Sequence, residues 1–224
     1  MRKPVIAPGE IYHILNRGTD LKPIFLDERD FVRFLYLVLH AQSSLPLNNT
    51  VRSVAHYALS RQFSRRASRV NEIVAKRVVT LIGFCLMPNH FHLIVREEKE
   101  GGMANYLHRI QNAYVKYFNT KYRRTGHLFQ GAYKAVRVES NTQLLHLSAY
   151  VHKNPRGLKE WRAALPDYPY GSFTDYIKEN RFGDLLDTEI ISSQFKNKKV
   201  DYRKFVDSST AKERDKNLGA IHLI

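Results

Sequence analysis

Residues 86–95 read LMPNHFHLIV, which combines a turn with the start of a strand. Pro88-Asn89 is a typical turn pair, and the apolar runs at 78–84 and 90–95 are typical of strands, so the sequence predicts a β-hairpin here. Side chains alternate along a strand, so we expect His90 and His92 on one face and Phe91 on the other, in the core. Two imidazoles on one face can hold a single metal ion from the same side.

The segments around this hairpin alternate between strand and helix patterns. The expected elements are a strand over 11–18, a helix that Asp27 caps, a helix over 103–122, a strand over 130–138 and a helix over 142–153 that stops before Pro155. The order β-α-β-β-α-β-α is typical of an α+β fold. It indicates a ferredoxin-like (split βαβ) antiparallel sheet with packed helices.

Two segments fall outside this pattern. Residues 43–77 begin as a loop and then carry a run of Lys and Arg that only Glu72 opposes. This indicates a basic, partly helical insertion on the rim of the domain, with a solvated loop of no special role as the alternative. We expect one domain over 1–180 that contains this insertion, and a C-terminal extension over 181–224 that is a small helical appendage or partly disordered.

The charge of the chain points to a polyanionic partner. Its 36 Lys and Arg against 21 Asp and Glu give a formal net charge of +15. Nucleic acid is the expected partner of so basic a compact protein, and a merely soluble basic surface is the alternative. The single Cys85 cannot form an internal disulfide, and no apolar run is long enough to span a membrane, so we expect a cytoplasmic protein.

Basic and aromatic residues interleave from Met103 to Val138, a stretch without any acidic residue. This pattern fits a groove for single-stranded nucleic acid, where bases stack and phosphates pair with charge, although half or more of the aromatics are expected in the core. The candidate DNA-binding residues here and elsewhere are Arg17, Arg109, Lys116, Arg123, Arg124, Lys134, Arg137 and Lys153.

The helix over 142–153 carries a tyrosine on its polar side. A helical wheel places Tyr150 with His146, Lys153 and Asn154, opposite the leucines. A rim tyrosine that bonds to water is one interpretation. The other is a nucleophile beside a metal held by His90 and His92, with Asn154 as a possible third ligand. Two imidazoles, an amide oxygen and open positions suit Mg²⁺ or Mn²⁺ better than a structural zinc ion.

These motifs resemble the single-tyrosine HUH transposases of bacterial insertion sequences, and most closely the REP-associated tyrosine transposases. The matching segments are Tyr12-His13-Ile14 with Arg17-Gly18, Met87 to His92, Gly126 to Lys134, and Tyr150 to Pro155. The resemblance covers roughly residues 10–175. It implies an HUH nuclease core, and a bacterial protein of the cytoplasm associated with the nucleoid.

The resemblance also implies an activity. The family cuts single-stranded DNA beside a folded hairpin, and its tyrosine becomes joined to the 5′ end while a 3′ hydroxyl is released. Carried over, His90 and His92 match the metal ligands, Tyr150 matches the nucleophile, and Asn154 matches a further ligand position. His13 receives no role from the sequence. Monomer and homodimer both stay open, since the smallest family members work as dimers and this chain is longer.

Two functions are therefore compared. The first is a metal-dependent transposase that nicks and joins single-stranded DNA at hairpins through Tyr150. The second is a non-catalytic binder of hairpin DNA or RNA that keeps the sheet and the basic groove. A replication-initiator nuclease of the same HUH class is a variant of the first, but it would usually need a helicase or an origin partner.

Overall fold

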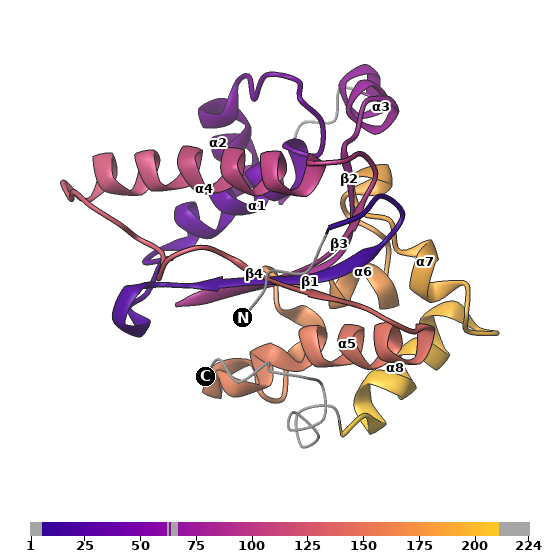
Figure 1. Cartoon of the computed structure of the whole chain (residues 1–224). Helices are drawn as coiled ribbons and strands as arrows, with labels where there is room; N and C mark the ends of the chain where they lie inside the picture. Colours follow the sequence, from indigo (N-terminus) through magenta and orange to yellow (C-terminus); the bar gives the residue numbers. More distant parts are fainter. Residues whose placement is uncertain (1–5, 62, 64–66, 211–224) are drawn as a thin grey trace.

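Four antiparallel strands form the centre of the molecule (Figure 1). The computed structural model describes residues 6–61, 63 and 67–210. The sheet order is β2-β3-β1-β4, which is the order of a split βαβ fold, so the predicted ferredoxin-like class is confirmed. The strands are β1 (Ile11–Arg17), β2 (Val79–Met87), β3 (His90–Glu97) and β4 (Lys134–Arg137).

Helices cover both faces of the sheet (Figure 1). The main ones are α1 (Glu28–His40), α2 (Thr50–Ser60), α3 (Ala67–Ala75), α4 (Gly102–Lys121), α5 (Asn141–Lys153), α6 (Phe173–Ile177), α7 (Glu189–Ser192) and α8 (Lys198–Ser208). Helices α1 and α4 pack on the face that carries Phe91, and α5 packs on the face that carries His92. Two hydrophobic cores result, one on each side of the sheet.

The helix starts follow the local chemistry of the chain. Asp27 accepts a hydrogen bond from the Asp30 amide at the start of α1, and Ser140 does the same for the Gln143 amide at the start of α5. Helix α4 begins differently: the Glu97 carboxylate, at the end of β3, accepts from the amides of Gly102 and Met103. Buried Glu97 thereby ties the hairpin to the helix that follows it.

The 43–77 segment is partly helical, as predicted, but it also contributes to the main core. Helices α2 and α3 lie within it, and Tyr57, Phe63 and Ile73 are buried against the α1 side of the sheet. The basic positions Arg65 and Arg66 lie outside the described residues. The segment is therefore more than a solvated loop, because it covers apolar surface that α1 alone would expose.

The strand predicted over 130–138 is too long. Strand β4 spans only Lys134–Arg137, and it pairs with β1 alone at the edge of the sheet. Gly131 has a φ of 73°, a left-handed conformation that interrupts an extended strand. The residues between α4 and β4 instead form an irregular loop laid against the end of β1, with the Thr19 amide bonded to the Leu128 carbonyl at 3.0 Å.

The other edge of the sheet is covered by the segment after Gly157. The Leu86 amide donates to the Tyr170 carbonyl at 2.9 Å, and the Ser172 amide donates to the Phe84 carbonyl at 3.0 Å. The Tyr176 hydroxyl donates to a further carbonyl of β2. This aromatic segment thus folds back on the body of the domain and removes the open edge that β2 would otherwise present.

Helices α7 and α8, within the C-terminal extension, pack beside α5 and α6. Tyr202 and Val206 of α8 are fully buried. None of the helices within the described part of the chain is long and apolar enough to cross a bilayer.

Candidate active site

The pairing of β1 with β3 brings three histidines to one face of the sheet. Arg17 lies opposite His90, Leu15 opposite His92 and His13 opposite Ile94. Because paired residues share a face, His13 and His92 are diagonal neighbours on the face that α5 covers. The predicted placement of His90 and His92 on one face, opposite Phe91, agrees with the structure.

The histidine rings are held through their Nδ1 atoms. His92 Nδ1 lies 2.9 Å from His13 Nε2, and His90 Nδ1 lies 2.7 Å from Asn89 Oδ1. The amide oxygen of Asn89 can only accept, so His90 Nδ1 carries the proton. If His92 likewise donates from Nδ1 to His13, both rings present Nε2 as the metal-binding nitrogen. Such outer contacts commonly orient ligating histidines.

His13 supplies its contact as a neutral ring. Burial lowers the pKa of His13 to about 3, so it carries no charge at neutral pH. The rings of His13 and His92 stack at 5.1 Å between centroids with an interplanar angle of 18°. A neutral imidazole can accept a hydrogen bond, whereas an imidazolium cannot. His13 therefore suits the orientation of His92.

Tyr150 lies directly over these histidines. Its ring centroid is 5.6 Å from that of His92 and 6.2 Å from that of His13, and its plane is nearly perpendicular to both rings. All three side chains come from the same chain. The tyrosine and the imidazole pair that the sequence singled out are therefore brought together, across about sixty residues of sequence.

The structure distinguishes the two interpretations of Tyr150. The rim interpretation requires a tyrosine at the solvent, but only 2% of Tyr150 is exposed. Lys153 and Asn154 on the same side are buried as well. Tyr150 faces the histidines of the sheet, whereas His146 of the same polar side lies against Phe205 of α8, and Lys153 donates to the Ser209 carbonyl. The rim interpretation is therefore excluded.

Asn154 closes the helix beneath Tyr150. It is the C-terminal cap of α5, and its Nδ2 donates to the Tyr150 carbonyl at 3.0 Å. With the nitrogen used in this way, the side-chain oxygen is the atom that Asn154 can offer to a metal ion. The same bond ties Asn154 to the turn of helix that carries the tyrosine.

The donor set fits a divalent ion that also binds substrate. No group of three or more His, Cys, Asp or Glu side chains among the described residues is arranged as a metal site. His90 and His92 offer two nitrogens on one face of the sheet, and an oxygen from the Asn154 amide would complete a set that leaves coordination positions for phosphate oxygens. This combination suits Mg²⁺ or Mn²⁺ and differs from a closed structural site.

Five of the predicted DNA-binding residues lie on β1, on α4, in the loop after α4 or on β4. They are Arg17, Lys116, Arg123, Arg124 and Lys134. Arg17 shares the histidine face with Lys134, which stands opposite Leu15 on β4. Lys116, Arg123 and Arg124 are exposed on α4 and the loop after it, and the Arg124 guanidinium lies 5.5 Å from the Phe118 ring.

Three others have structural partners. Arg109 donates to the carbonyls of Ala41, Ser43 and Leu45, where it closes the turn after α1. Arg137 forms an ion pair with Glu10 at 2.7 Å and lies opposite Tyr12, on the other face of the sheet from His92. The sequence pattern did not reveal these partners, because they come from distant segments.

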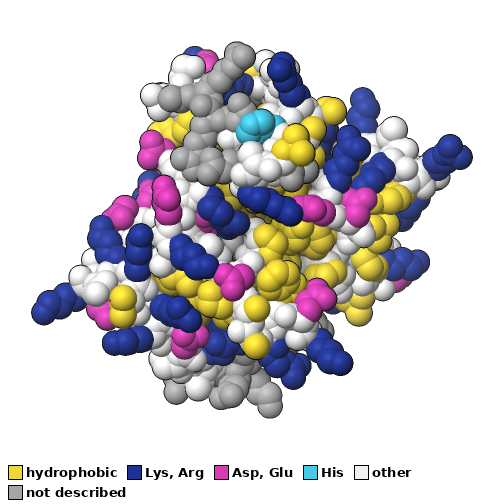
Figure 2. All heavy atoms as spheres, turned by 180° about the vertical axis from the view of Figure 1, so that it is seen from behind, with side chains coloured by type: hydrophobic (Ala, Val, Ile, Leu, Met, Phe, Trp, Pro, Cys, Tyr) yellow, Lys and Arg dark blue, Asp and Glu magenta, His cyan; other side chains and the backbone are white. Residues whose placement is uncertain are grey.

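Lys153 is the third of these. It is 8% exposed, and its ammonium group donates to the Ser209 carbonyl just beyond α8. More generally, Lys and Arg are spread widely over the back of the molecule, with acidic side chains between them (Figure 2). On this face the charge alone therefore does not outline a binding groove.

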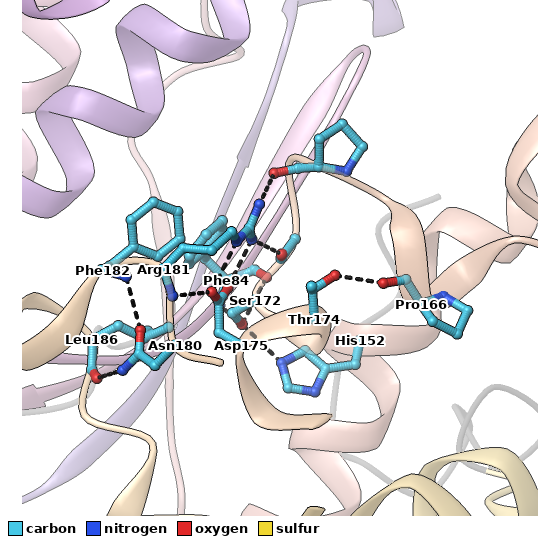
Figure 3. Close-up of polar contacts among 12 residues, drawn as sticks. Phe84, His152, Pro166, Ser172, Thr174, Asp175, Asn180, Arg181, Phe182 and Leu186 are labelled. Carbon is cyan, nitrogen blue, oxygen red and sulfur yellow. Dashed lines mark hydrogen bonds and ion pairs between the residues drawn. The ribbon is translucent and has the colours of Figure 1, made fainter. Parts of the chain in front are cut away.

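A second polar cluster holds α5 from its other side, and sequence reasoning missed it. His152 Nε2 lies 2.8 Å from Ser172 Oγ, and His152 Nδ1 lies 2.6 Å from the Tyr202 hydroxyl. Ser172 also bonds to the Phe84 backbone on β2, and the Tyr202 hydroxyl donates to Ser148 at 3.0 Å. Figure 3 shows His152 reaching Ser172 beside Phe84.

The same region contains a buried ion pair. Asp175 of α6 accepts two side-chain hydrogen bonds from Arg181, which also donates to the Pro169 and Gly171 carbonyls (Figure 3). These bonds hold the strand-covering segment in place. The only sequence signal for either cluster was the density of aromatic and polar residues after Gly157.

Part of the chain matches a known protein family. Residues 53–154 match the model of the family described as "Transposase IS200 like". The matched segment contains His90, His92 and Tyr150, and it ends at Asn154. The resemblance to the transposases of insertion sequences is therefore confirmed. No curated protein matches the sequence.

A solved structure has the same fold. It is described as "Structure of the REP associates tyrosine transposase bound to a REP hairpin", and it matches with a TM-score of 0.51 over 84% of this chain and 93% of its own. The two sequences are 11% identical. The match shows a shared architecture that extends beyond the family segment.

Proposed function

We propose that this chain is a metal-dependent transposase that nicks and joins single-stranded DNA beside a hairpin, with Tyr150 as the nucleophile. The observation that carries the proposal is the Tyr150 ring, 5.6 Å from that of His92 and within a single chain. The family match to IS200-like transposases and the hairpin-bound structure of the same fold support the substrate class. The net charge of +15 supports a polyanionic strand.

The chemistry is a phosphodiester exchange. The Tyr150 hydroxyl loses its proton and its oxygen attacks the scissile phosphorus, forming a bond from tyrosine to phosphorus. The bond from phosphorus to the 3′ oxygen breaks, and that oxygen takes up a proton and leaves as a 3′ hydroxyl. The 5′ phosphate stays on Tyr150, and attack by a 3′ hydroxyl reverses the step to join strands. No oxidant or energy source is needed.

Each residue has a separate task in this proposal. His90, His92 and Asn154 would hold Mg²⁺ or Mn²⁺, which when bound would polarise the scissile phosphate. His13 orients His92. The helix α5 holds the Tyr150 oxygen in place, and its burial keeps competing water away from the phenol. Arg17 and Lys134, on the same face of the sheet, would neutralise neighbouring phosphates.

The test is capture of the covalent intermediate. Purified protein is incubated with Mn²⁺ and labelled single-stranded hairpins from beside its own gene, and the products are separated on a denaturing gel. We expect a labelled band at the mass of the protein, absent in Tyr150→Phe and present in Tyr133→Phe. Hairpin binding without this band in any metal would instead support the non-catalytic binder.

A further inference from the structure

A cavity of about 530 Å³ opens between α4 and the loop that leads to β4. Its size is within the range of about 300–1,000 Å³ that small-ligand sites occupy. The lining residues used below are Thr19, Gln111, Asn112, Val115, His127 and Phe129. No residue of the candidate active site lines it. It is a separate feature with its own chemistry.

The walls of the cavity are fixed by backbone contacts. Gly126 and Gly131 have φ values of 84° and 73°, which turn the loop at each end. Between them, Phe129 forms a bridge with Gly18, and the Asn119 side chain donates to the Gly126 carbonyl at 3.0 Å. The cavity is thus formed before any ligand arrives, which lowers the entropy cost of binding.

The lining combines an apolar wall with amide groups. Phe129 is buried and meets Phe91 edge to face at 6.0 Å, and Val115 adds a second apolar surface. Gln111 Nε2 is buried and makes no hydrogen bond to any described residue. A buried amide of this kind normally has a partner. Asn112 also lines the cavity; its Nδ2 lies 2.8 Å from His108 Nε2, so its Oδ1 is the atom that it can offer to a ligand beside the Gln111 amide.

A nucleobase is the ligand that fits this combination. Amide side chains match the donor and acceptor edge of a base, and aromatic or apolar walls match its face. The segment that forms the cavity has no acidic residue from Met103 to Val138, and it carries the exposed Lys116, Arg123 and Arg124. A base that enters the cavity would therefore bring its phosphates to a basic surface.

The position of the cavity links it to the candidate active site. Thr19 lines the cavity, and two residues earlier Arg17 lies opposite His90. The Gly18 amide donates to the Asn89 carbonyl at 2.8 Å, directly before His90. Cavity and histidines are thus at the same end of the sheet. The cavity lies toward the α4 face of the sheet and the histidines on the α5 face, so a strand bound at the histidines would reach the cavity by passing around this end of the sheet.

We propose that this cavity binds one unpaired nucleobase of the DNA strand held at the active site, with Gln111 and Asn112 reading its edge. The proposal rests on the proposed function, because it needs a single-stranded substrate. In this proposal the side-chain amides of Gln111 and Asn112, and not the catalytic residues, determine the sequence preference at one nucleotide outside the hairpin stem.

The test pairs DNA and protein changes. Each single-stranded nucleotide that flanks a hairpin from beside the gene is replaced in turn by an abasic residue, and the Kd is measured in EDTA. For the wild type we expect one position where the abasic residue weakens binding about tenfold. In Gln111→Ala the same replacement should have no further effect, since this variant no longer holds the base.

Two further variants complete the design. Asn105→Ala is the matched control, because Asn105 is an exposed amide on α4 outside the cavity, and it should behave like the wild type. Val115→Phe fills the cavity from another side and should remove the abasic effect as Gln111→Ala does. Thermal unfolding of each variant confirms that it is folded.

The outcomes separate the two proposals. If the wild type binds the hairpin with the same Kd whichever flanking nucleotide is abasic, the cavity proposal fails. It also fails if one abasic residue weakens binding equally in the wild type and in Gln111→Ala. Either outcome leaves the transposase proposal intact. A wild type that binds a hairpin no better than an unstructured strand of equal length contradicts the proposed function, and the cavity proposal fails with it.

Discussion

Tyr150 and His152 stand two residues apart on α5 and are held by different partners. Tyr150 meets the His92 ring at 5.6 Å between centroids, whereas His152 bonds to Ser172 and Tyr202. Two residues along a helix are separated by about 200° of rotation, so the two contacts fix α5 from both sides. The C-terminal helix α8, through Tyr202, thereby helps to orient the tyrosine that faces the sheet.

Loss of the Tyr202 hydroxyl should loosen this arrangement. Tyr202→Phe keeps the ring and removes its hydrogen bonds to Ser148 and His152, so we expect the free energy of unfolding to fall by about 1–3 kcal/mol. Adduct formation should slow while hairpin affinity is unchanged. Urea unfolding and a timed adduct assay measure both. Equal stability of Tyr202→Phe and wild type would show that the cluster does not hold α5.

His13 should control metal affinity without touching the metal. His13→Phe keeps a flat ring beside His92 but removes the nitrogen 2.9 Å from its Nδ1. Loss of such an outer contact typically weakens metal binding about 10–100-fold. Mn²⁺ titration followed by electron paramagnetic resonance, without DNA, gives the affinity directly. His13→Asn, which restores an acceptor, should recover part of it, and equal affinity of all three proteins would refute the role.

Removal of the metal ligands should separate cutting from binding. His90→Ala and His92→Ala should give no adduct in Mg²⁺ or Mn²⁺, and EDTA should have the same effect on the wild type. Hairpin affinity in EDTA should match the wild type, because few of the phosphate contacts lie at the metal. Gel shift and adduct assays on one set of samples check this. Adduct formation that persists in His90→Ala with EDTA present would exclude a metal-dependent mechanism.

The basic residues should divide into two groups by salt dependence. In the triple variant Lys116→Ala, Arg123→Ala and Arg124→Ala, we expect the slope of log Kd against log salt to fall by about 0.7–0.9 for each phosphate that is no longer neutralised. Arg109→Ala is the control: it should lower Tm and leave the slope intact, because Arg109 bonds to carbonyls after α1. A slope unchanged in the triple variant would place the DNA on another surface.

Acid should destabilise the fold through its buried histidines. Burial lowers the pKa of His152 to about 3 from an ordinary value of 6.5, and its hydrogen-bond and ring-contact partners Ser172, Tyr202, Tyr176 and Phe173 are all neutral. Between these pH values the unfolded chain binds a proton that the native state does not. The free energy of unfolding therefore falls as pH drops below 6.5, by about 1.4 kcal/mol per pH unit for each such histidine.

His40, whose pKa burial lowers to about 4, adds to the same slope. Urea unfolding in EDTA from pH 8 to pH 5 gives the slope for the wild type. In His152→Gln, the slope of the free energy of unfolding against pH should fall by the contribution of one proton. The free energy of unfolding of this variant at pH 8, compared with the wild type, gives the effect of lost packing alone. A slope that His152→Gln leaves unchanged would mean that His152 is protonated in the native state.

The local patterns of the chain account for much of this protein. Alternation along β3 places His90 and His92 together because side-chain direction in a strand depends only on neighbouring residues. Caps at Asp27 and Ser140 start α1 and α5 because a side chain needs to reach only two or three residues ahead. The family motifs then identified Tyr150 and the transposase resemblance.

Which distant residues meet depends instead on the packing of the whole chain. His13 contacts His92 across 79 positions, Arg109 is occupied by carbonyls after α1, and Tyr150 of α5 is buried beside His92. None of these follows from periodicity, since strand register and the face that a helix covers depend on packing between segments far apart in the chain. The order of amino acids therefore fixed the chemistry available to this protein, and the packing fixed which of those groups share a site.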